Sequence, residues 1–205
     1  MPNESERTLL TSLILSSLGP LVLGTALFFG QSSTQIADFI RRSAELMAII
    51  VSWLIFRTIH KKEKPDLLQK IRLEKVAKLC IGSAMILSAV AMLFVAFLSI
   101  NITQGSVLPS LTIAILGVIT NSWFWLRYRQ LSQVNPGIIL LAQKRLFGAK
   151  TMVDLSVVLS LSYIAIAPNS PAVSYVDSAG SVIVALYLLI SGIKTVQSRQ
   201  QLPRE

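Results

Sequence analysis

The sequence predicts an all-α membrane protein, a bundle of six transmembrane helices with both termini in the cytoplasm. Hydrophobic residues make up 53% of the 205-residue chain and charged residues only 14%, whereas about a quarter of the residues in a soluble domain are charged. Long apolar runs recur along the chain, and Lys and Arg gather in every second connection between them. Each run supplies the roughly 20 residues that a helix needs to cross a bilayer. We therefore expect a single domain, residues 1–205, embedded in lipid.

The apolar runs define six spans in order along the chain. The first run follows a short stretch that lacks the basic segment of a signal peptide, so we expect it to be retained. The fifth run is longer than a span and contains Lys144 and Arg145, so its membrane part is expected to begin near Phe147 and to end before Pro168. The expected spans are residues 9–29, 36–59, 76–100, 108–128, 147–167 and 173–196.

Three of the spans carry additional signals. The third is rich in small residues between Gly82 and Ala91, which allow close helix packing. Aromatic residues at the basic end of the fourth, Trp123 and Tyr128 among them, are typical of interfacial anchors. In the sixth, Asp177 is expected to cap the helix N-terminus, because a carboxylate accepts hydrogen bonds from first-turn amides.

The basic residues predict the orientation of the bundle. The second and fourth connections and their flanks are rich in Lys and Arg, whereas the first, third and fifth connections contain none. Because Lys and Arg accumulate on the cytoplasmic side of short loops, both termini are expected to be cytoplasmic. The net charge of +9 then reflects the ends of the spans and attraction to anionic lipid, and nucleic acid is not expected as a partner.

Six ionisable residues form two clusters inside the second and fifth expected spans. A charged residue near the bilayer centre costs about 2.5–3.5 kcal/mol of insertion free energy, so such residues are expected either to have compensating partners or to have a function. Four of them occupy positions i, i+3, i+4 and i+7 of the second span and two are i and i+4 in the fifth, so each set shares a helix face. They are Asp38, Arg41, Arg42 and Glu45 in the second span and Lys150 and Asp154 in the fifth.

The second span resembles the second transmembrane helix of cation diffusion facilitators, whose pattern is Ala-Asp-x-x-His-Ser-x-x-Asp or a close relative. Ala37 and Asp38 match this pattern directly. Arg41 falls where the family has a metal-binding His or Asp, and Glu45 falls on the second ligand.

Later segments extend the resemblance. Lys150 and Asp154 resemble the His-x-x-x-Asp ligand pair of the family's fifth helix, with Lys in place of His. The stretch from Tyr175 resembles the start of the sixth helix, where Asp177 is kept and the usual Pro is Ser178. The basic-Ala-Glu element that precedes the family's third helix is similar to Arg72-Leu-Glu74, without the glycines ahead of it.

The resemblance implies a bundle of cation-efflux type and a function. The implied activity is efflux of a divalent metal cation from the cytoplasm in exchange for an external proton, by alternating access across helices two and five. It also implies a homodimer, sited as a multi-pass protein in a cell inner (plasma) membrane. Family members generally carry a cytoplasmic C-terminal domain, but here the sequence ends at Glu205 soon after the last span, so no such domain is expected in this chain.

The substituted positions change the chemistry of the implied site. Arginine has no lone pair to give and stays charged, so Arg41 cannot ligate a metal and repels one. Lys150 could ligate only if burial lowered its pKa drastically. Glu45 and Asp154 remain as the candidate metal-binding positions, zinc is a poor fit as substrate, and no cofactor is expected.

The ionisable cluster therefore has three interpretations. In the first, Arg41 with Glu45, Asp38 with Arg42, and Lys150 with Asp154 are ion pairs that only specify helix packing, as in a non-transporting pseudo-transporter or membrane scaffold. In the second, the site still conducts a cation or proton, which binds in turn to the carboxylates of Glu45, Asp154 and Asp38, and Lys150 is a titratable partner. In the third, the basic residues attract an anionic substrate.

Catalysis is not expected. The only histidine, His60, lies at a basic helix end beside Lys61 and Lys62, where we expect a solvated terminus and not a catalytic or ligating role. The sequence contains no phosphate-binding loop and no Cys/His constellation. Asn121 in the fourth span is either an interhelical hydrogen-bonding residue or a pore-facing one, and the sequence does not distinguish these roles.

Overall fold

The computed structural model is an all-α bundle. It describes residues 4–29, 33–61, 67–98, 107–134, 137–166 and 172–197, and in these ranges every residue except Gly137 is helical. The all-α fold and the number of helices are thus confirmed in the described part of the chain. The helices are α1 (Glu4–Phe29), α2 (Ser33–Lys61), α3 (Leu67–Leu98), α4 (Val107–Val134), α5 (Ile138–Ile166) and α6 (Ala172–Gln197).

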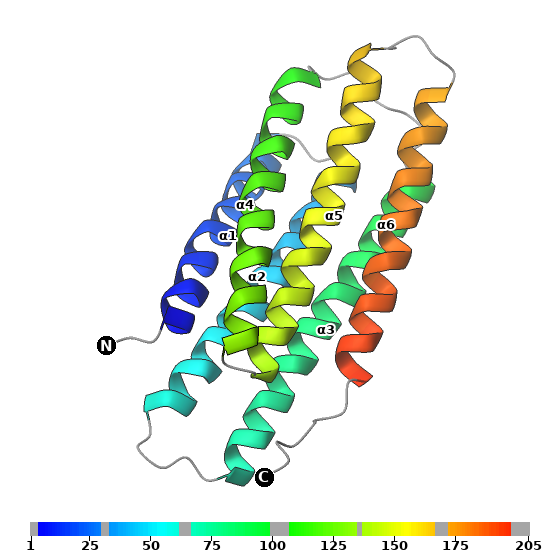
Figure 1. Ribbon diagram of the computed structural model, residues 1–205. Helices are drawn as coiled ribbons and strands as arrows, with labels where there is room; N and C mark the ends of the chain where they lie inside the picture. Colours follow the sequence, from blue (N-terminus) through cyan, green and yellow to red (C-terminus); the bar gives the residue numbers. More distant parts are fainter. Residues whose placement is uncertain are drawn as a thin grey trace.

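The six helices run side by side along one long axis (Figure 1). The closest pairs are α4 with α5, α3 with α6 and α2 with α3, while α1 packs mainly on α2. The starts of α1, α3 and α5 and the ends of α2, α4 and α6 lie at the same end of the bundle, the lower end in Figure 1. This arrangement agrees with the predicted alternation of connections, which puts both termini on one side.

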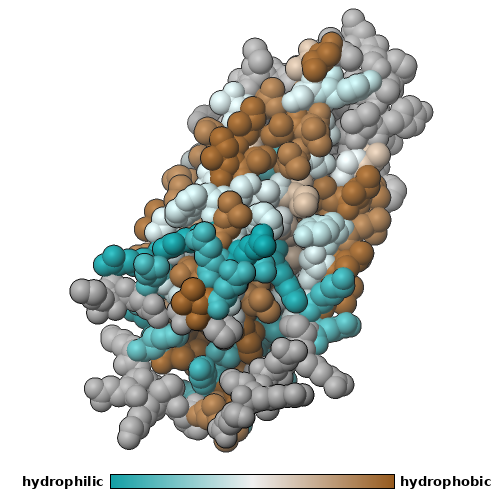
Figure 2. Space-filling view, in the orientation of Figure 1, coloured by the Kyte–Doolittle hydropathy of each residue, from teal (hydrophilic) through white to brown (hydrophobic). Residues whose placement is uncertain are grey.

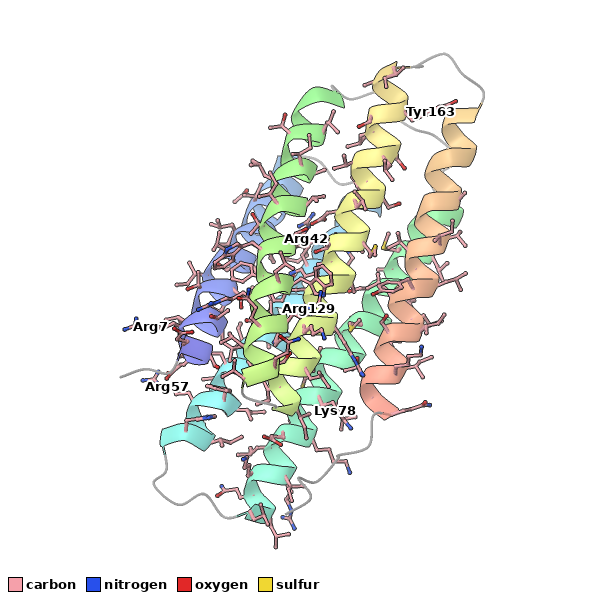
Figure 3. All side chains as sticks on the ribbon, in the orientation of Figure 1. Arg7, Arg42, Arg57, Lys78, Arg129 and Tyr163 are labelled. Carbon is pink, nitrogen blue, oxygen red and sulfur yellow. The ribbon has the colours of Figure 1, made fainter. Side chains whose placement is uncertain are left out.

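The lower end is also the basic end. Figure 3 places Arg7, Arg57 and Lys78 toward it, whereas Arg42 lies deeper in the bundle and Tyr163 lies near the opposite end. In Figure 2 hydrophilic side chains gather over the lower part of the visible face and apolar side chains dominate above them. We call this end, which carries the basic α2–α3 and α4–α5 connections, the basic end; it is the predicted cytoplasmic side.

Two helical segments in the described residues are long and apolar enough to cross a membrane by themselves, Leu67–Phe94 and Ile138–Tyr163. The segment Val182–Gln197 is apolar but shorter. In α2 the hydropathy is lowered by Arg41, Arg42 and Glu45, which lie within its apolar run. All six helices nonetheless expose large apolar side chains, as contact with lipid requires. Examples are Leu18, Met47, Leu87, Leu116, Leu159 and Ile183.

The contact between α3 and α6 depends on glycine. A Cβ added to Gly192 would lie 3.0 Å from the backbone oxygen of Gly82, and one added to Gly82 would lie 2.5 Å from a methyl carbon of Val196. Neither helix could approach so closely with a larger residue at these positions. Gly82 therefore allows close helix packing, which is the role that the sequence predicted for the small residues of the third span.

One expectation about a helix start is wrong. Asp177 was expected to cap the sixth helix, but α6 begins at Ala172, so Asp177 lies inside it. The apolar run already began at residue 173, and the helix follows it from Ala172, so a cap four residues into that run was not compatible with the span.

Candidate functional site

The centre of the candidate site is the carboxylate of Glu45 on α2. Glu45 is 2% exposed and faces the bundle interior. Its Oε2 atom lies 3.3 Å from Lys150 Nζ on α5, and its Oε1 atom lies 3.9 Å from Arg41 Nη1, one turn earlier on α2. A buried carboxylate is tolerated only when charges and hydrogen bonds compensate it, so these two cations are what keep Glu45 charged in the interior.

A hydroxyl from α3 completes the surroundings of Glu45. Ser88 is fully buried, and its Oγ lies 3.2 Å from Glu45 Oε1 as a donor. The same Oγ lies 2.8 Å from the carbonyl oxygen of Ala84, so its single proton is shared between the two acceptors. Glu45 thus joins three helices, with Arg41 on its own helix, Lys150 on α5 and Ser88 on α3.

Asp154 lies one turn beyond Lys150 on α5 but has a different partner. Its Oδ2 atom accepts a hydrogen bond of 2.6 Å from the side-chain amide of Asn121 on α4. A Cβ on Gly117 would lie 2.8 Å from the same oxygen, so the carboxylate packs directly against the α4 backbone. Asn121 therefore takes the first of its two possible roles, as an interhelical hydrogen-bonding residue.

The structure changes one expected ion pair and retains another. Arg41 and Glu45 pair as expected at i and i+4. Lys150 was expected to pair with Asp154 on its own helix, but this is wrong: its ammonium is directed to Glu45 on α2, and Asp154 binds Asn121 instead. The buried interhelical carboxylate offers Lys150 a more strongly desolvated partner than the neighbouring turn does.

Arg42 lies beside the pair and is half-buried against α1. A Cβ on Gly19 would lie 3.3 Å from Arg42 Cδ, so this glycine gives the arginine stem its space. Asp38 belongs to α2, one turn earlier, but its side chain lies outside the described residues. The expected pair of Asp38 and Arg42 stays a prediction.

Buried aromatic rings lie between the ion pair and the basic end. Lys150 Nζ sits 5.1 Å from the ring centroid of Phe147, within cation–π range. The Phe147 ring packs against Phe124 and Tyr128 at centroid distances of 5.1 and 5.3 Å, and the Tyr128 hydroxyl is 2.7 Å from Ser12 Oγ on α1. We call Phe124, Tyr128 and Phe147 the aromatic floor of the site.

Another polar residue lies on the basic side of this floor. Gln143 on α5 is fully buried, and neither polar atom of its side chain has a hydrogen-bond partner in the described structure. Leaving such an amide unsatisfied costs about 1–3 kcal/mol, so a buried residue of this kind calls for an explanation.

A metal centre of the usual composition is not formed by the described residues. Among them no three His, Cys, Asp or Glu side chains come together. His60 lies near the end of α2, where its ring stacks on Phe56 and its Nδ1 atom is 2.9 Å from the Phe56 carbonyl oxygen. The candidate site therefore consists of carboxylate, hydroxyl and amide groups together with the cationic side chains of Arg41 and Lys150.

The sequence matches a family model described as the cation efflux transmembrane domain over residues 9–199. The matched range runs from the first turns of α1 to the end of α6 and includes the whole candidate site. The chain belongs to the cation efflux family. None of the curated proteins matches it.

Membership of the cation efflux family makes this chain a membrane protein of a family that transports cations. The resemblance predicted that Arg41, Glu45, Lys150 and Asp154 occupy the family's ligand positions. The structure brings the first three into one contact group, and Asp154 lies one turn beyond Lys150 on α5.

Sequence reasoning missed three contributors to the site of this cation efflux protein. Ser88 was grouped with the small packing residues, although its hydroxyl meets Glu45. Gly117 and Phe147 carried no signal of their own, because a glycine or phenylalanine in an apolar span is ordinary. Their roles depend on which helix lies opposite, which a local pattern does not contain.

Proposed function

We propose that this cation efflux protein moves a cation by letting it alternate with the Lys150 ammonium at Glu45. The observation that carries the proposal is the 3.3 Å contact between Lys150 Nζ and a carboxylate that is almost completely buried. A positive charge already occupies the position at which a transported cation would bind Glu45. For the substrate to enter, the flexible lysine stem must withdraw, and for the substrate to leave, the ammonium must return.

The composition of the site selects the kind of cation. With Lys150 withdrawn, the two carboxylates of Glu45 and Asp154 and the guanidinium of Arg41 sum to one negative charge, and the nearby Arg42 only lowers that excess. One charge balances a monovalent cation and only half of a divalent one. The available donors are oxygens of Glu45, Asp154 and Ser88, which suit hard cations, and the imidazole or thiolate ligands that zinc prefers are missing from this donor set.

We further propose that the exchanged ion is a proton and that the protein works by alternating access as a homodimer in the inner (plasma) membrane. These points follow from the family resemblance. The aromatic floor and Gln143 support closure toward the basic end, because they put buried rings and one buried amide between the ion pair and that side. In this state a cation from the cytoplasm would have to displace the aromatic floor to reach Glu45.

A second candidate function is a non-transporting pseudo-transporter or membrane scaffold. The observation that favours it is the complete pairing of Glu45 by Lys150, Arg41 and Ser88 on three helices. Because every partner in this network is satisfied, the network could equally well serve only to fix how α2, α3 and α5 pack together.

Flux measurements in liposomes separate the two functions. Purified protein is reconstituted, a pH gradient is imposed, and uptake of sodium, zinc, manganese, iron and cobalt is recorded in turn. We expect sodium uptake driven by the gradient, and at least a tenfold loss in Glu45→Gln, because the substitution removes the charge that binds the cation. Glu74→Gln, a half-buried acid on α3 near the basic end, is the matched control and should retain uptake. If folded protein transported none of these ions, the transport proposal would be refuted and the scaffold function would be favoured.

A further inference from the structure

A second site lies on the outside of the bundle, away from the buried charges. At the basic end, α1 and α4 enclose a cavity of about 460 Å³ that opens to the surface. Its lining includes Glu4, Arg7 and Thr11 from α1 and Trp123, Leu126 and Arg127 from α4. These two helices pack against each other much less than α1 packs on α2 or α4 packs on α5, which leaves room for a ligand between them.

The cavity carries an excess of positive charge. Its two guanidinium groups, on Arg7 and Arg127, face one carboxylate, that of Glu4. Arg127 Nη2 lies 3.0 Å from Glu4 Oε2, and both side chains are exposed enough to rearrange. Arg7 forms no ion pair with any side chain that the structure describes within 4.0 Å. Paired guanidinium groups bind phosphate through two parallel hydrogen bonds each, which makes a phosphate monoanion or diester a natural ligand.

Apolar surface continues from the cavity toward the middle of the bundle. Ile14 on α1 is 56% exposed, and Ile119 and Trp123 on α4 are 60% and 55% exposed. Figure 2 shows apolar side chains above the hydrophilic lower part of the visible face. An exposed tryptophan beside arginines is typical of the headgroup level of a membrane. A ligand with a phosphate at one end and hydrocarbon at the other matches this order of polar and apolar surface.

We propose that this cavity binds the headgroup of an anionic phospholipid, with the phosphate at Arg7 and Arg127 and the acyl chains along Ile14 and Ile119. On binding, Arg127 exchanges Glu4 for the phosphate, and Trp123 packs against the glycerol region. The site is independent of the transport proposal, because none of its residues belongs to the Glu45 group.

Binding of phosphatidylglycerol to the purified protein in detergent, followed by native mass spectrometry, tests this proposal. We expect the wild type to bind phosphatidylglycerol at least tenfold more tightly than phosphatidylcholine. The double variant Arg7→Gln with Arg127→Gln should lose at least tenfold in affinity for phosphatidylglycerol. Arg129→Gln, which removes an exposed arginine of α4 outside the cavity, is the matched control and should stay within twofold of the wild type.

A variant with the opposite expected effect guards against misfolding as the explanation. Glu4→Gln removes the carboxylate that competes for Arg127, so it should bind phosphatidylglycerol a few fold more tightly. The proposal is overturned if Arg129→Gln weakens binding as much as the double variant does, or if phosphatidylcholine binds equally well. It is also overturned if Glu4→Gln weakens binding, or if millimolar inorganic phosphate displaces the lipid, because the site would then recognise free phosphate.

Discussion

Replacing Glu45 with alanine is expected to lower the free energy of unfolding by about 3–5 kcal/mol. The substitution leaves the ammonium of Lys150 and the guanidinium of Arg41 in the interior without the carboxylate that both contact. It also takes an acceptor from the fully buried Ser88 hydroxyl. Breaking a buried ion pair by removing one partner is costly because the remaining charge is uncompensated. The measurement is reversible unfolding of the purified protein in mixed micelles, with helicity as the signal.

Two companion variants separate loss of the charge network from loss of side-chain volume. Glu74→Ala removes a half-buried glutamate of α3 near the basic end, and its cost should stay below about 1 kcal/mol. Adding Lys150→Met to Glu45→Ala should recover part of the lost stability, because one of the two stranded cations is gone. If Glu45→Ala and Glu74→Ala lowered the free energy of unfolding equally, the ion pairs around Glu45 would not behave as a buried network.

Changing both Arg41 and Lys150 to histidine is expected to create zinc binding. The two imidazoles would face Glu45 from the positions that the cations hold now, and Asp154 lies one turn beyond Lys150. Two imidazoles with carboxylate oxygens form an ordinary tetrahedral zinc site, and the exchange also removes two repelling positive charges. We expect the zinc affinity to rise at least tenfold over that of the wild type, which corresponds to about 1.4 kcal/mol. Isothermal titration of the purified variant measures it.

The control for this experiment is the pair Arg41→Gln with Lys150→Gln. It removes the same two charges but supplies no imidazole, so it should bind zinc more weakly than the histidine pair. A folded histidine variant with no advantage over the glutamine variant would contradict the assignment of these two positions to the family's ligand positions.

Local patterns in the sequence predicted much of the fold. The apolar runs have the length of spans and the basic residues alternate between connections, so six helices with both ends on one side follow from general rules of membrane insertion. The helices extend beyond the expected spans mainly at the basic end, where α3 starts at Leu67 and α5 at Ile138. A hydropathy window ends at the first charges, whereas backbone hydrogen bonding continues through them.

The partner of each charge could not be predicted in the same way. Positions i and i+4 correctly suggested Arg41 with Glu45, because that contact lies within one helix. The same rule failed for Lys150, whose ammonium is 3.3 Å from a carboxylate more than a hundred residues earlier. Whether a lysine turns along its own helix or across to another depends on how α2 and α5 pack, and a helical period says nothing about that packing.

The central claim, that the Lys150 ammonium holds the position of a transported cation at Glu45, is tested most directly by the sodium affinity of Lys150→Met. Methionine keeps an unbranched stem of similar length but removes the competing charge, and Arg41 still partly compensates Glu45. Isothermal titration of purified wild-type and variant protein gives both affinities under the same conditions. We predict that Lys150→Met binds sodium at least tenfold more tightly than the wild type. An affinity that is unchanged or lower in a folded variant would contradict the claim.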